Sequence, residues 1–331
     1  MAVRRRKQRR GRSYAWRYRG RIVACVFVEV LIICALVIMV GWNKGVKEWF
    51  EQFEQPVLKE VDISGINSPN AILMHARGGK VLGEINGDEK IYPASMTKIM
   101  TVILGIENFD DLDEKITLTD EMFAGLYEQD ATQAGFQPGE EVRVIDLLYG
   151  AMLPSGAECC IALADTISGA EADFAELMNK KAAKLGMDNT HFCDSTGLHN
   201  PDHYSTVKDI AVLMKYCIKN DTFREIIETA RHSTGVTNIH PDGITYYSTM
   251  FKNLSDPTVT GGKILGGKTG YTSEAGHCLV SFAEIEGREY IFVSAGASGA
   301  DGNTIPHIQD AVTVYNRVGA AIEAKMNDNN K

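Results

Sequence analysis

The sequence predicts an α+β fold in which helices cover both faces of one antiparallel sheet. Strand-like runs lie at both ends of the domain that follows residue 60, and the residues between them show helical periodicity. Strands that are far apart along the chain must pair to complete such a sheet, so we expect the middle helices to form a subdomain beside it. A hydrophobic content of 44% and a charged content of 23% suit a globular protein.

The first part of this domain is expected to form two strands and a helix. Residues 71–76 and 81–85 are strand-like and enclose a glycine-rich turn. Pro93 ends this region, and apolar residues at helical intervals then predict a helix over residues 95–106.

The middle of the domain is expected to be helical, and its end to form four strands and a helix. A helical block covers residues 144–187, with breaks near residues 154–156 and Gly169, and helical periodicity returns at residues 206–219. The expected strands after it are residues 243–250, 264–268, 278–283 and 290–295. A final helix is expected over residues 304–324, so that the domain covers residues 61–325 and a polar tail covers residues 326–331.

The N-terminal residues carry a strong positive charge. Residues 1–21 contain ten basic side chains and no acidic one, and since the whole chain carries −9, the remainder carries about −19. A basic run by itself is typical of a nucleic-acid-binding arm. Here the apolar residues 22–42 follow it directly, so we expect no nucleic-acid partner.

Residues 22–42 are expected to form an uncleaved transmembrane signal anchor in the cell membrane. Twenty-one helical residues span about 30 Å, which matches the hydrocarbon core of a lipid bilayer. The basic flank keeps the N-terminus in the cytoplasm and places the acidic domain outside. The alternative is a cleaved signal peptide, whose apolar region is usually about 7–15 residues and ends at a small-x-small site that is absent here. Glu29 within the span is interpreted as a protonated or snorkelling side chain rather than as a helix–helix or proton-linked contact.

Residues 43–60 are charged and carry aromatic residues at helical intervals, which predicts an amphipathic juxtamembrane stalk. The seven cysteines and eight histidines show no metal-ligand spacing, so we expect no metal site. Two of the cysteines, Cys25 and Cys34, fall in the apolar span. We expect most of the other five to be small buried hydrophobic residues, and one disulfide among them is the alternative.

Three short blocks, in this order, predict a serine nucleophile with a lysine base. They are residues 95–98 (Ser-Met-Thr-Lys), 155–157 (Ser-Gly-Ala) and 268–270 (Lys-Thr-Gly). This set is typical of penicillin-recognising enzymes, although each block alone is also common on ordinary protein surfaces. Helix positions i and i+3 share a face, so Ser95 and Lys98 bring a hydroxyl beside an amine. The amine acts as a base only if burial or a second cation lowers its pKa, and Lys268 supplies such a cation.

The sequence around these blocks resembles the D-alanyl-D-alanine carboxypeptidases, the low-molecular-weight penicillin-binding proteins of peptidase family S11. The resembling segments are residues 92–101, 178–179, 185–192, 196–198, 203–206 and 267–276. The resemblance covers roughly residues 61–325 and implies a β-lactamase/transpeptidase-like fold. It also implies a D,D-peptidase domain that acts on peptidoglycan stem pentapeptides, takes β-lactams as covalent inhibitors and needs no metal or organic cofactor.

The same resemblance assigns a role to each site residue. Ser95 would attack the carbonyl between two D-alanines, and Lys98 would take its proton. Ser155 would relay a proton to the leaving D-alanine. The Lys268–Thr269–Gly270 segment would hold the terminal carboxylate of the substrate. The backbone N–H groups of Ser95 and Tyr271 would form the oxyanion hole.

One departure from the family pattern leaves alternatives open. The family usually has Asn at the position of Ala157, and this amide normally contacts the substrate and the catalytic lysine. Three alternatives to the carboxypeptidase therefore stay open. They are a D,D-endopeptidase, a β-lactamase, and a penicillin-binding protein with weak or no turnover. An upstream arginine that some relatives use for the carboxylate cannot be assigned between Tyr246 and Lys268. We expect structural roles for the remaining polar residues that stand out, which are Glu158, Glu176, His203, Tyr204 and Asp209.

Overall fold

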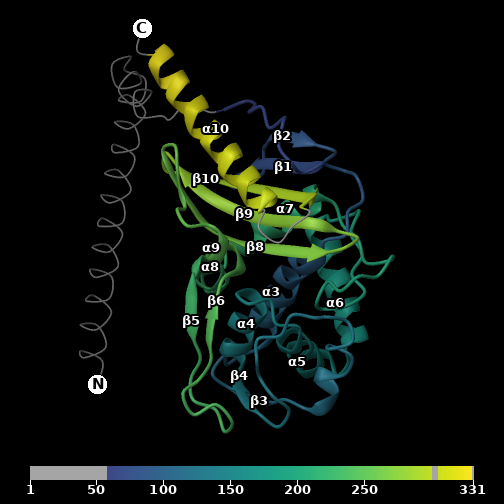
Figure 1. Cartoon of the computed structure of the whole chain (residues 1–331). Helices are drawn as coiled ribbons and strands as arrows, with labels where there is room; N and C mark the ends of the chain where they lie inside the picture. Colours follow the sequence, from purple (N-terminus) through teal and green to yellow (C-terminus); the bar gives the residue numbers. More distant parts are fainter. Residues whose placement is uncertain (1–57, 300–304, 330–331) are drawn as a thin grey trace, which may run out of the picture. The chain divides into compact units, whose positions relative to one another are not determined.

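The computed structural model describes residues 58–299 and 305–329, and it has the α+β architecture predicted from the sequence (Figure 1). One sheet has the strand order β2-β1-β10-β9-β8-β7, and every neighbouring pair in it is antiparallel. Its strands are β1 (Asn70–His75), β2 (Val81–Ile85), β7 (Thr258–Val259), β8 (Gly262–Thr272), β9 (Gly276–Ile285) and β10 (Arg288–Ala297).

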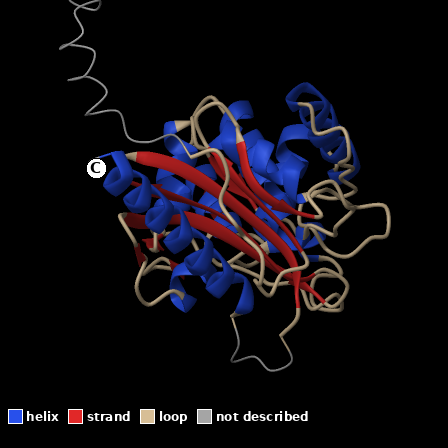
Figure 2. Ribbon diagram, turned by 90° about the horizontal axis from the view of Figure 1, so that it is seen from above, coloured by secondary structure: helices blue, strands red, loops and turns tan. Residues whose placement is uncertain are grey.

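The sheet is completed by strands from opposite ends of the domain, as predicted. β1 lies beside β10 with Asn70 opposite Ala295 and His75 opposite Tyr290. Figure 2 shows the strands side by side as one twisted sheet between helices. Alternate residues of each strand point to opposite faces, and residues 278–283 of β9 and 290–295 of β10 are all buried, so both faces of these two strands are covered.

One face of the sheet packs against α10 (Pro306–Asn329), which crosses it in Figure 1. Tyr290 and Phe292 of β10 lie in the same buried cluster as Val314 and Tyr315 of this helix. The predicted final helix is therefore confirmed. It continues to Asn329, so part of the expected polar tail is helical.

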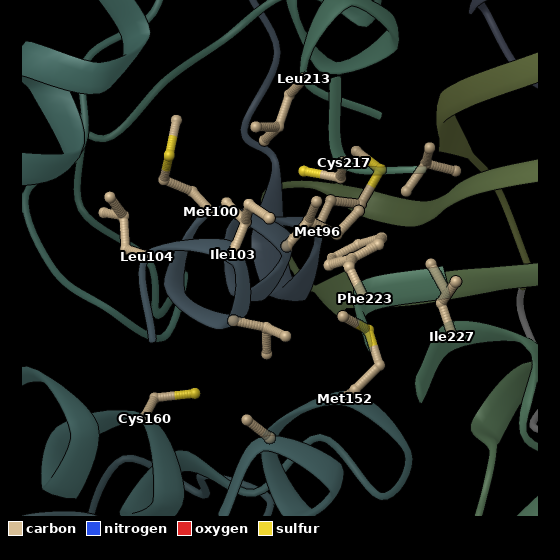
Figure 3. Packing of buried hydrophobic residues seen from close by; sticks show 14 of the residues in the cluster. Met96, Met100, Ile103, Leu104, Met152, Cys160, Leu213, Cys217, Phe223 and Ile227 are labelled. Atoms are coloured by element: carbon tan, nitrogen blue, oxygen red, sulfur yellow. The ribbon is translucent and has the colours of Figure 1, made fainter. Parts of the chain in front are cut away.

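The other face of the sheet packs against the helical subdomain, whose centre is α3 (Lys98–Asn108). The first eight residues of α3 are all buried, because other helices surround it. Figure 3 shows Met100 and Ile103 of α3 among Met152, Leu213 and Phe223 from the neighbouring helices. These helices are α4 (Val144–Met152), α5 (Ala157–Ser168), α6 (Glu171–Leu185), α7 (Val207–Cys217) and α8 (Asp221–Glu228).

Some short elements differ from the prediction. The expected strand at residues 243–250 is wrong at its end, because only β6 (Thr245–Tyr247) is extended. The Ser248 hydroxyl then accepts the Phe251 N–H and caps α9 (Thr249–Asn253). The sequence patterns did not predict α8, the short helix η2 (Asp120–Phe123) or four short strands. These strands are β3 (Lys115–Thr117), β4 (Glu141–Arg143), β5 (Arg231–Ser233) and β7.

The predicted cytoplasmic segment, the apolar span of residues 22–42 and most of the stalk lie outside the described residues. Within the residues that are described, no helix combines the length and the hydropathy that crossing a bilayer requires.

Gly319 offers a test of how α10 packs on the sheet. A Cβ at this position would lie 2.0 Å from the carbonyl oxygen of Thr260, which is backbone and cannot move aside cheaply. Alanine normally stabilises a helix interior relative to glycine by about 1 kcal/mol. We expect Gly319→Ala instead to lower the free energy of unfolding by about 2 kcal/mol or more, measured by urea denaturation. Ala320→Gly, at the exposed next position, is the control and should cost only about 1 kcal/mol. A stabilised Gly319→Ala protein would contradict the packing.

Candidate active site

A cleft of about 700 Å³ lies where β8 meets the helical subdomain. Five of the residues predicted for the site line it: Ser95, Ser155, Thr269, Gly270 and Tyr271. The two predicted lysines, Lys98 and Lys268, are buried behind this wall. The structure therefore brings all three sequence blocks together in one place.

Ser95 is presented by η1 (Ala94–Thr97), a short 3-10 helix that leads directly into α3. Its Oγ lies 3.0 Å from Nζ of Lys98, as the i and i+3 spacing predicted. The preceding residue, Ala94, has a φ of +46°, a backbone conformation that costs energy for a residue with a Cβ. This strained turn directs the Ser95 side chain into the cleft.

The Lys98 amine sits in surroundings that disfavour its charged form. Only 4% of the residue is exposed, and this burial lowers the pKa of Lys98 below its ordinary value. The nearby negative or potentially negative groups, Cys160, Asp194 and Glu158, oppose the shift, but burial has the larger effect. A neutral amine beside a serine hydroxyl is a suitable general base.

Ser155 and Lys268 form a second hydroxyl–amine pair. Ser155 lies at the predicted break between α4 and α5 and has a φ of +73°. The Lys268 Nζ donates to the Ser155 Oγ over 3.0 Å and to the Thr269 carbonyl over 2.9 Å. Burial, followed by the charge of Lys98, lowers the pKa of Lys268 well below its ordinary value.

The strand β8 forms the other wall of the cleft. A Cβ on Gly270 would lie 3.0 Å from the Ser95 nitrogen, so glycine allows this strand to approach the turn that carries Ser95 closely. The Thr269 hydroxyl lies 2.7 Å from that of Thr249, the first residue of α9. Tyr271 is 60% exposed at the rim.

Ala157 and Glu158 begin α5 next to Ser155. Ala157 is buried, and its N–H donates to the Thr132 carbonyl. Glu158 points away from the reacting groups and accepts the N–H groups of Ala134 and Gly135 at 2.6 and 2.9 Å. Its second oxygen is buried with no hydrogen-bond partner, and burial raises the pKa of this carboxyl. Glu158 therefore anchors the loop that supplies Thr132 to the cleft.

The other polar residues singled out from the sequence lie outside the cleft. Glu176 is exposed on α6 and pairs with Lys180 at 3.3 Å. Asp209 lies in the first turn of α7 and accepts the N–H of Asn189. Neither side chain can reach a substrate at Ser95.

The five cysteines of the described residues are free, and only Cys193 is not buried. The prediction that most of them are buried is therefore confirmed. Burial raises the pKa of the Cys160 thiol to about 12, so this thiol is unreactive at neutral pH.

Two features of the site were not predicted from the sequence. Thr249 was expected in a strand but reaches Thr269 from a capped helix. The loop of residues 194–198 supplies the Thr196 carbonyl, which accepts from Lys98 over 2.7 Å. The helix-cap pattern at Ser248 could have indicated the first feature, whereas no local pattern indicates the second.

The charged groups that line the cleft are few. Among the described residues that line it there is no lysine or arginine, and the titratable bases are His199, His277 and His307. The acidic side chains there are Asp130 and Glu274. The arginine contact that could not be assigned from the sequence is thus not supplied by the described cleft wall.

Comparison with known proteins agrees with this arrangement. Residues 57–299 match the peptidase S11 family model, described as D-alanyl-D-alanine carboxypeptidase. DacF of Bacillus subtilis is 36% identical over 231 residues, which cover 69% of this chain and 57% of DacF. DacC of Escherichia coli is 34% identical over 262 residues, which cover 72% of this chain and 58% of DacC. The chain thus spans somewhat more than half the length of these two curated relatives.

Solved structures show the same fold. The crystal structure of the Streptomyces K15 DD-transpeptidase aligns with a TM-score of 0.69 at 29% identity, covering 79% of this chain and 100% of that one. A D-alanyl-D-alanine carboxypeptidase from Mycobacterium tuberculosis aligns with the same TM-score at 23% identity, which supports the fold alone. With its three sequence blocks gathered in one cleft and most of its length matched by the family model, this chain belongs to peptidase family S11, the D-alanyl-D-alanine carboxypeptidases.

Proposed function

We propose that this protein is a membrane-anchored serine D,D-carboxypeptidase that removes the terminal D-alanine from peptidoglycan stem pentapeptides. The observation that carries the proposal is the 3.0 Å separation of Ser95 Oγ and Lys98 Nζ at an open cleft. The lowered pKa of Lys98 makes its amine a base, and family membership supplies the substrate class.

The proposed reaction proceeds through an acyl-enzyme. The Ser95 Oγ attacks the carbonyl carbon of the penultimate D-alanine while Lys98 takes the hydroxyl proton. The backbone N–H groups of Ser95 and Tyr271 stabilise the negative oxygen of the tetrahedral intermediate. The C–N bond then breaks, and Ser155 relays the proton that Lys98 took from Ser95 to the amine of the departing D-alanine. Water finally hydrolyses the ester and frees Ser95.

The substrate carboxylate is proposed to bind near Thr269. The Lys268 side chain is buried and its amine donates to Ser155 and Thr269, so it acts from behind the cleft wall. Thr269 itself lines the cleft and is the group that meets the carboxylate directly.

Release of D-alanine from a stem pentapeptide, together with intact mass after penicillin treatment, tests the proposal. We expect both D-alanine release and a penicilloyl adduct that maps to the peptide containing Ser95. Cleavage of muropeptide dimers would indicate the endopeptidase, and rapid nitrocefin hydrolysis would indicate a β-lactamase. Absence of both the adduct and D-alanine release would contradict a serine D,D-peptidase.

A penicillin-binding protein with weak turnover is the second candidate, because Ala157 offers the cleft no amide where the family usually has asparagine. This candidate forms the same covalent adduct but releases little D-alanine. The Ser95–Lys98 pair is complete in both candidates, so the difference lies in the steps after acylation.

Ala157→Asn separates these two candidates. We expect the variant to keep penicillin labelling, since Ser95 and Lys98 are untouched, and to release D-alanine faster than the parent protein. The measurement is the steady-state rate of D-alanine release beside the rate of labelling. Ala162→Ser, a polar change at another buried position of α5, is the control and should leave both rates unchanged. An Ala157→Asn variant with unchanged or slower release would show that the missing amide does not limit turnover.

Residues 22–42 are proposed to tether the catalytic domain to the outer side of the cell membrane. The support is the apolar run after a strongly basic segment. We expect the full chain to stay in the membrane fraction after a carbonate wash and to be released by detergent. The double substitution Ile33→Arg and Leu36→Arg should abolish this retention, since each arginine costs about 2.5–3.5 kcal/mol at the centre of a span. Retention of the double variant would contradict the anchor.

A further inference from the structure

Lys98 has a second partner besides Ser95, on the loop of residues 194–198. Its Nζ donates to the Thr196 carbonyl over 2.7 Å, and Ser95 Oγ lies 3.0 Å from the same nitrogen. A neutral amine has two N–H bonds and one lone pair. When one N–H is held by this carbonyl, the directions left to the lone pair are restricted, and the position of the carbonyl decides whether the lone pair meets the serine hydroxyl.

Asp194 fixes the direction of that carbonyl. Its Oδ1 accepts the N–H of Thr196 at 2.7 Å, the hydroxyl of Thr196 at 2.8 Å and the N–H of Gly197 at 2.6 Å. The Gly197 N–H and the Thr196 carbonyl belong to one peptide group, in which they point in opposite directions. Holding the N–H on Asp194 therefore aims the carbonyl at Lys98.

His203 lies between the Asp194 carboxylate and Thr97, in the turn that carries Ser95. Its Nδ1 lies 3.0 Å from Asp194 Oδ2, and its Nε2 lies 2.9 Å from the Thr97 hydroxyl. Thr97 directly precedes Lys98 in the chain, so this series of contacts starts and ends at the same turn. The order hydroxyl–imidazole–carboxylate is that of a catalytic triad. However, the Thr97 hydroxyl is fully buried and cannot meet a substrate, so these groups can act only through Lys98.

Close backbone packing makes the arrangement stiff. Gly197 has a φ of +80°, and a Cβ there would lie 1.9 Å from the Ala94 carbonyl oxygen and 2.8 Å from the Thr97 hydroxyl. The loop thus presses against the turn that carries Ser95, and a small shift of the loop would move the acceptor of Lys98.

We propose that Asp194 and His203 are positioning residues for the catalytic base: they hold the Thr196 carbonyl on Lys98 and so direct its lone pair at Ser95. This inference rests on the proposed acyl-enzyme function. The loop of residues 194–198, which lies outside the three sequence blocks, thereby has a role in acylation.

Asp194 also acts on Lys98 through its charge. Burial acts to raise the pKa of Asp194, but hydrogen bonds from His203, Thr196 and Gly197 outweigh it and hold this pKa down to about 2, so Asp194 is ionised at neutral pH. Its charge raises the pKa of Lys98. The other titratable groups that interact electrostatically with Lys98 are Glu158, Cys159 and Cys160 of α5 and Lys268 of β8.

The test compares the pH dependence of penicillin acylation in Asp194→Asn and His203→Gln with that of the parent protein. The measured quantity is the second-order rate constant of a fluorescent penicillin between about pH 5 and 10. We expect both variants to acylate about 10–100-fold more slowly on the plateau, because the base is misdirected. In Asp194→Asn the acidic limb should also move to lower pH by roughly 0.5–1 unit, because a negative charge near Lys98 is removed.

His240→Gln is the matched control, since His240 pairs with the buried carboxylate of Glu140 at 2.8 Å but does not line the cleft. It should keep the parent rate and the parent pH profile. Thermal unfolding of each variant gives the folded fraction at the assay temperature. Parent rates and profiles in folded Asp194→Asn and His203→Gln, or losses that only follow the folded fraction, would overturn the positioning role. A parent protein that forms no adduct would overturn the positioning role and the proposed function together.

Discussion

Ser95→Ala is expected to abolish the covalent penicillin adduct and to lower D-alanine release at least about a thousandfold. The Ser95 hydroxyl is the one oxygen of η1 that both faces the cleft and lies 3.0 Å from the amine of Lys98. Without this oxygen no ester can form, although the cleft and the carboxylate site remain. Intact mass after penicillin treatment and a D-alanine assay measure the two effects.

The control for this substitution is Ser273→Ala. Ser273 lines the same cleft, and none of the described residues that line it is a lysine, so removal of the Ser273 hydroxyl should leave the adduct and the D-alanine rate close to those of the parent protein. An adduct that persists in Ser95→Ala would show that another residue is the nucleophile. Because the Ser95 side chain carries only one polar atom at an open cleft, we expect its loss to change the unfolding free energy by less than about 1 kcal/mol.

Lys98→Met is expected to slow acylation by about 10²–10⁴-fold, the usual contribution of a general base. Methionine fills a similar apolar volume in the buried site but has no amine to take the proton from Ser95. Lys98→Arg should not restore the rate, since a guanidinium stays protonated and cannot act as a base. The measurement is the second-order rate constant of penicillin acylation. A Lys98→Met protein that acylates at the parent rate would contradict the assignment of the base.

The rate of acylation by the parent protein should fall as the pH is lowered. Lys98 acts only when neutral, so acylation should be lost as the pH falls through the pKa of Lys98. Burial lowers that pKa, and the active plateau is therefore reached at a lower pH than the value of about 10.4 for an exposed lysine would allow. The acidic limb should be absent in Lys98→Met, because the group that produces it is gone. An unchanged limb in this variant would assign the titration to another residue.

The fold could be predicted largely from local patterns. The strands β1, β2, β9 and β10 and the helices α3 to α7 carry apolar residues at strand or helix intervals, and these intervals are visible without any partner. The pair Ser95 and Lys98 was also predictable, because three residues of spacing along a helical turn is a local property.

The rest of the site depends on contacts between segments far apart in the sequence. Thr97 and His203 are 106 residues apart, and no periodicity indicates that their side chains meet. The same holds for Ser155 and Lys268, which are 113 residues apart and were associated only through the family resemblance. Burial of the two lysines, which sets their proton affinity, is likewise a result of tertiary packing.

The pairing of β1 with β10 has a consequence for the order in which the molecule matures. Residue 71 finds its partner only at residue 294, so the central ladder cannot close until almost the entire domain has emerged from the ribosome. Ser95 is synthesised early, yet the strand that completes its cleft is β8, which begins at residue 262. A nascent chain therefore carries Ser95 without the strand that completes its cleft, and the site can assemble only near the end of synthesis.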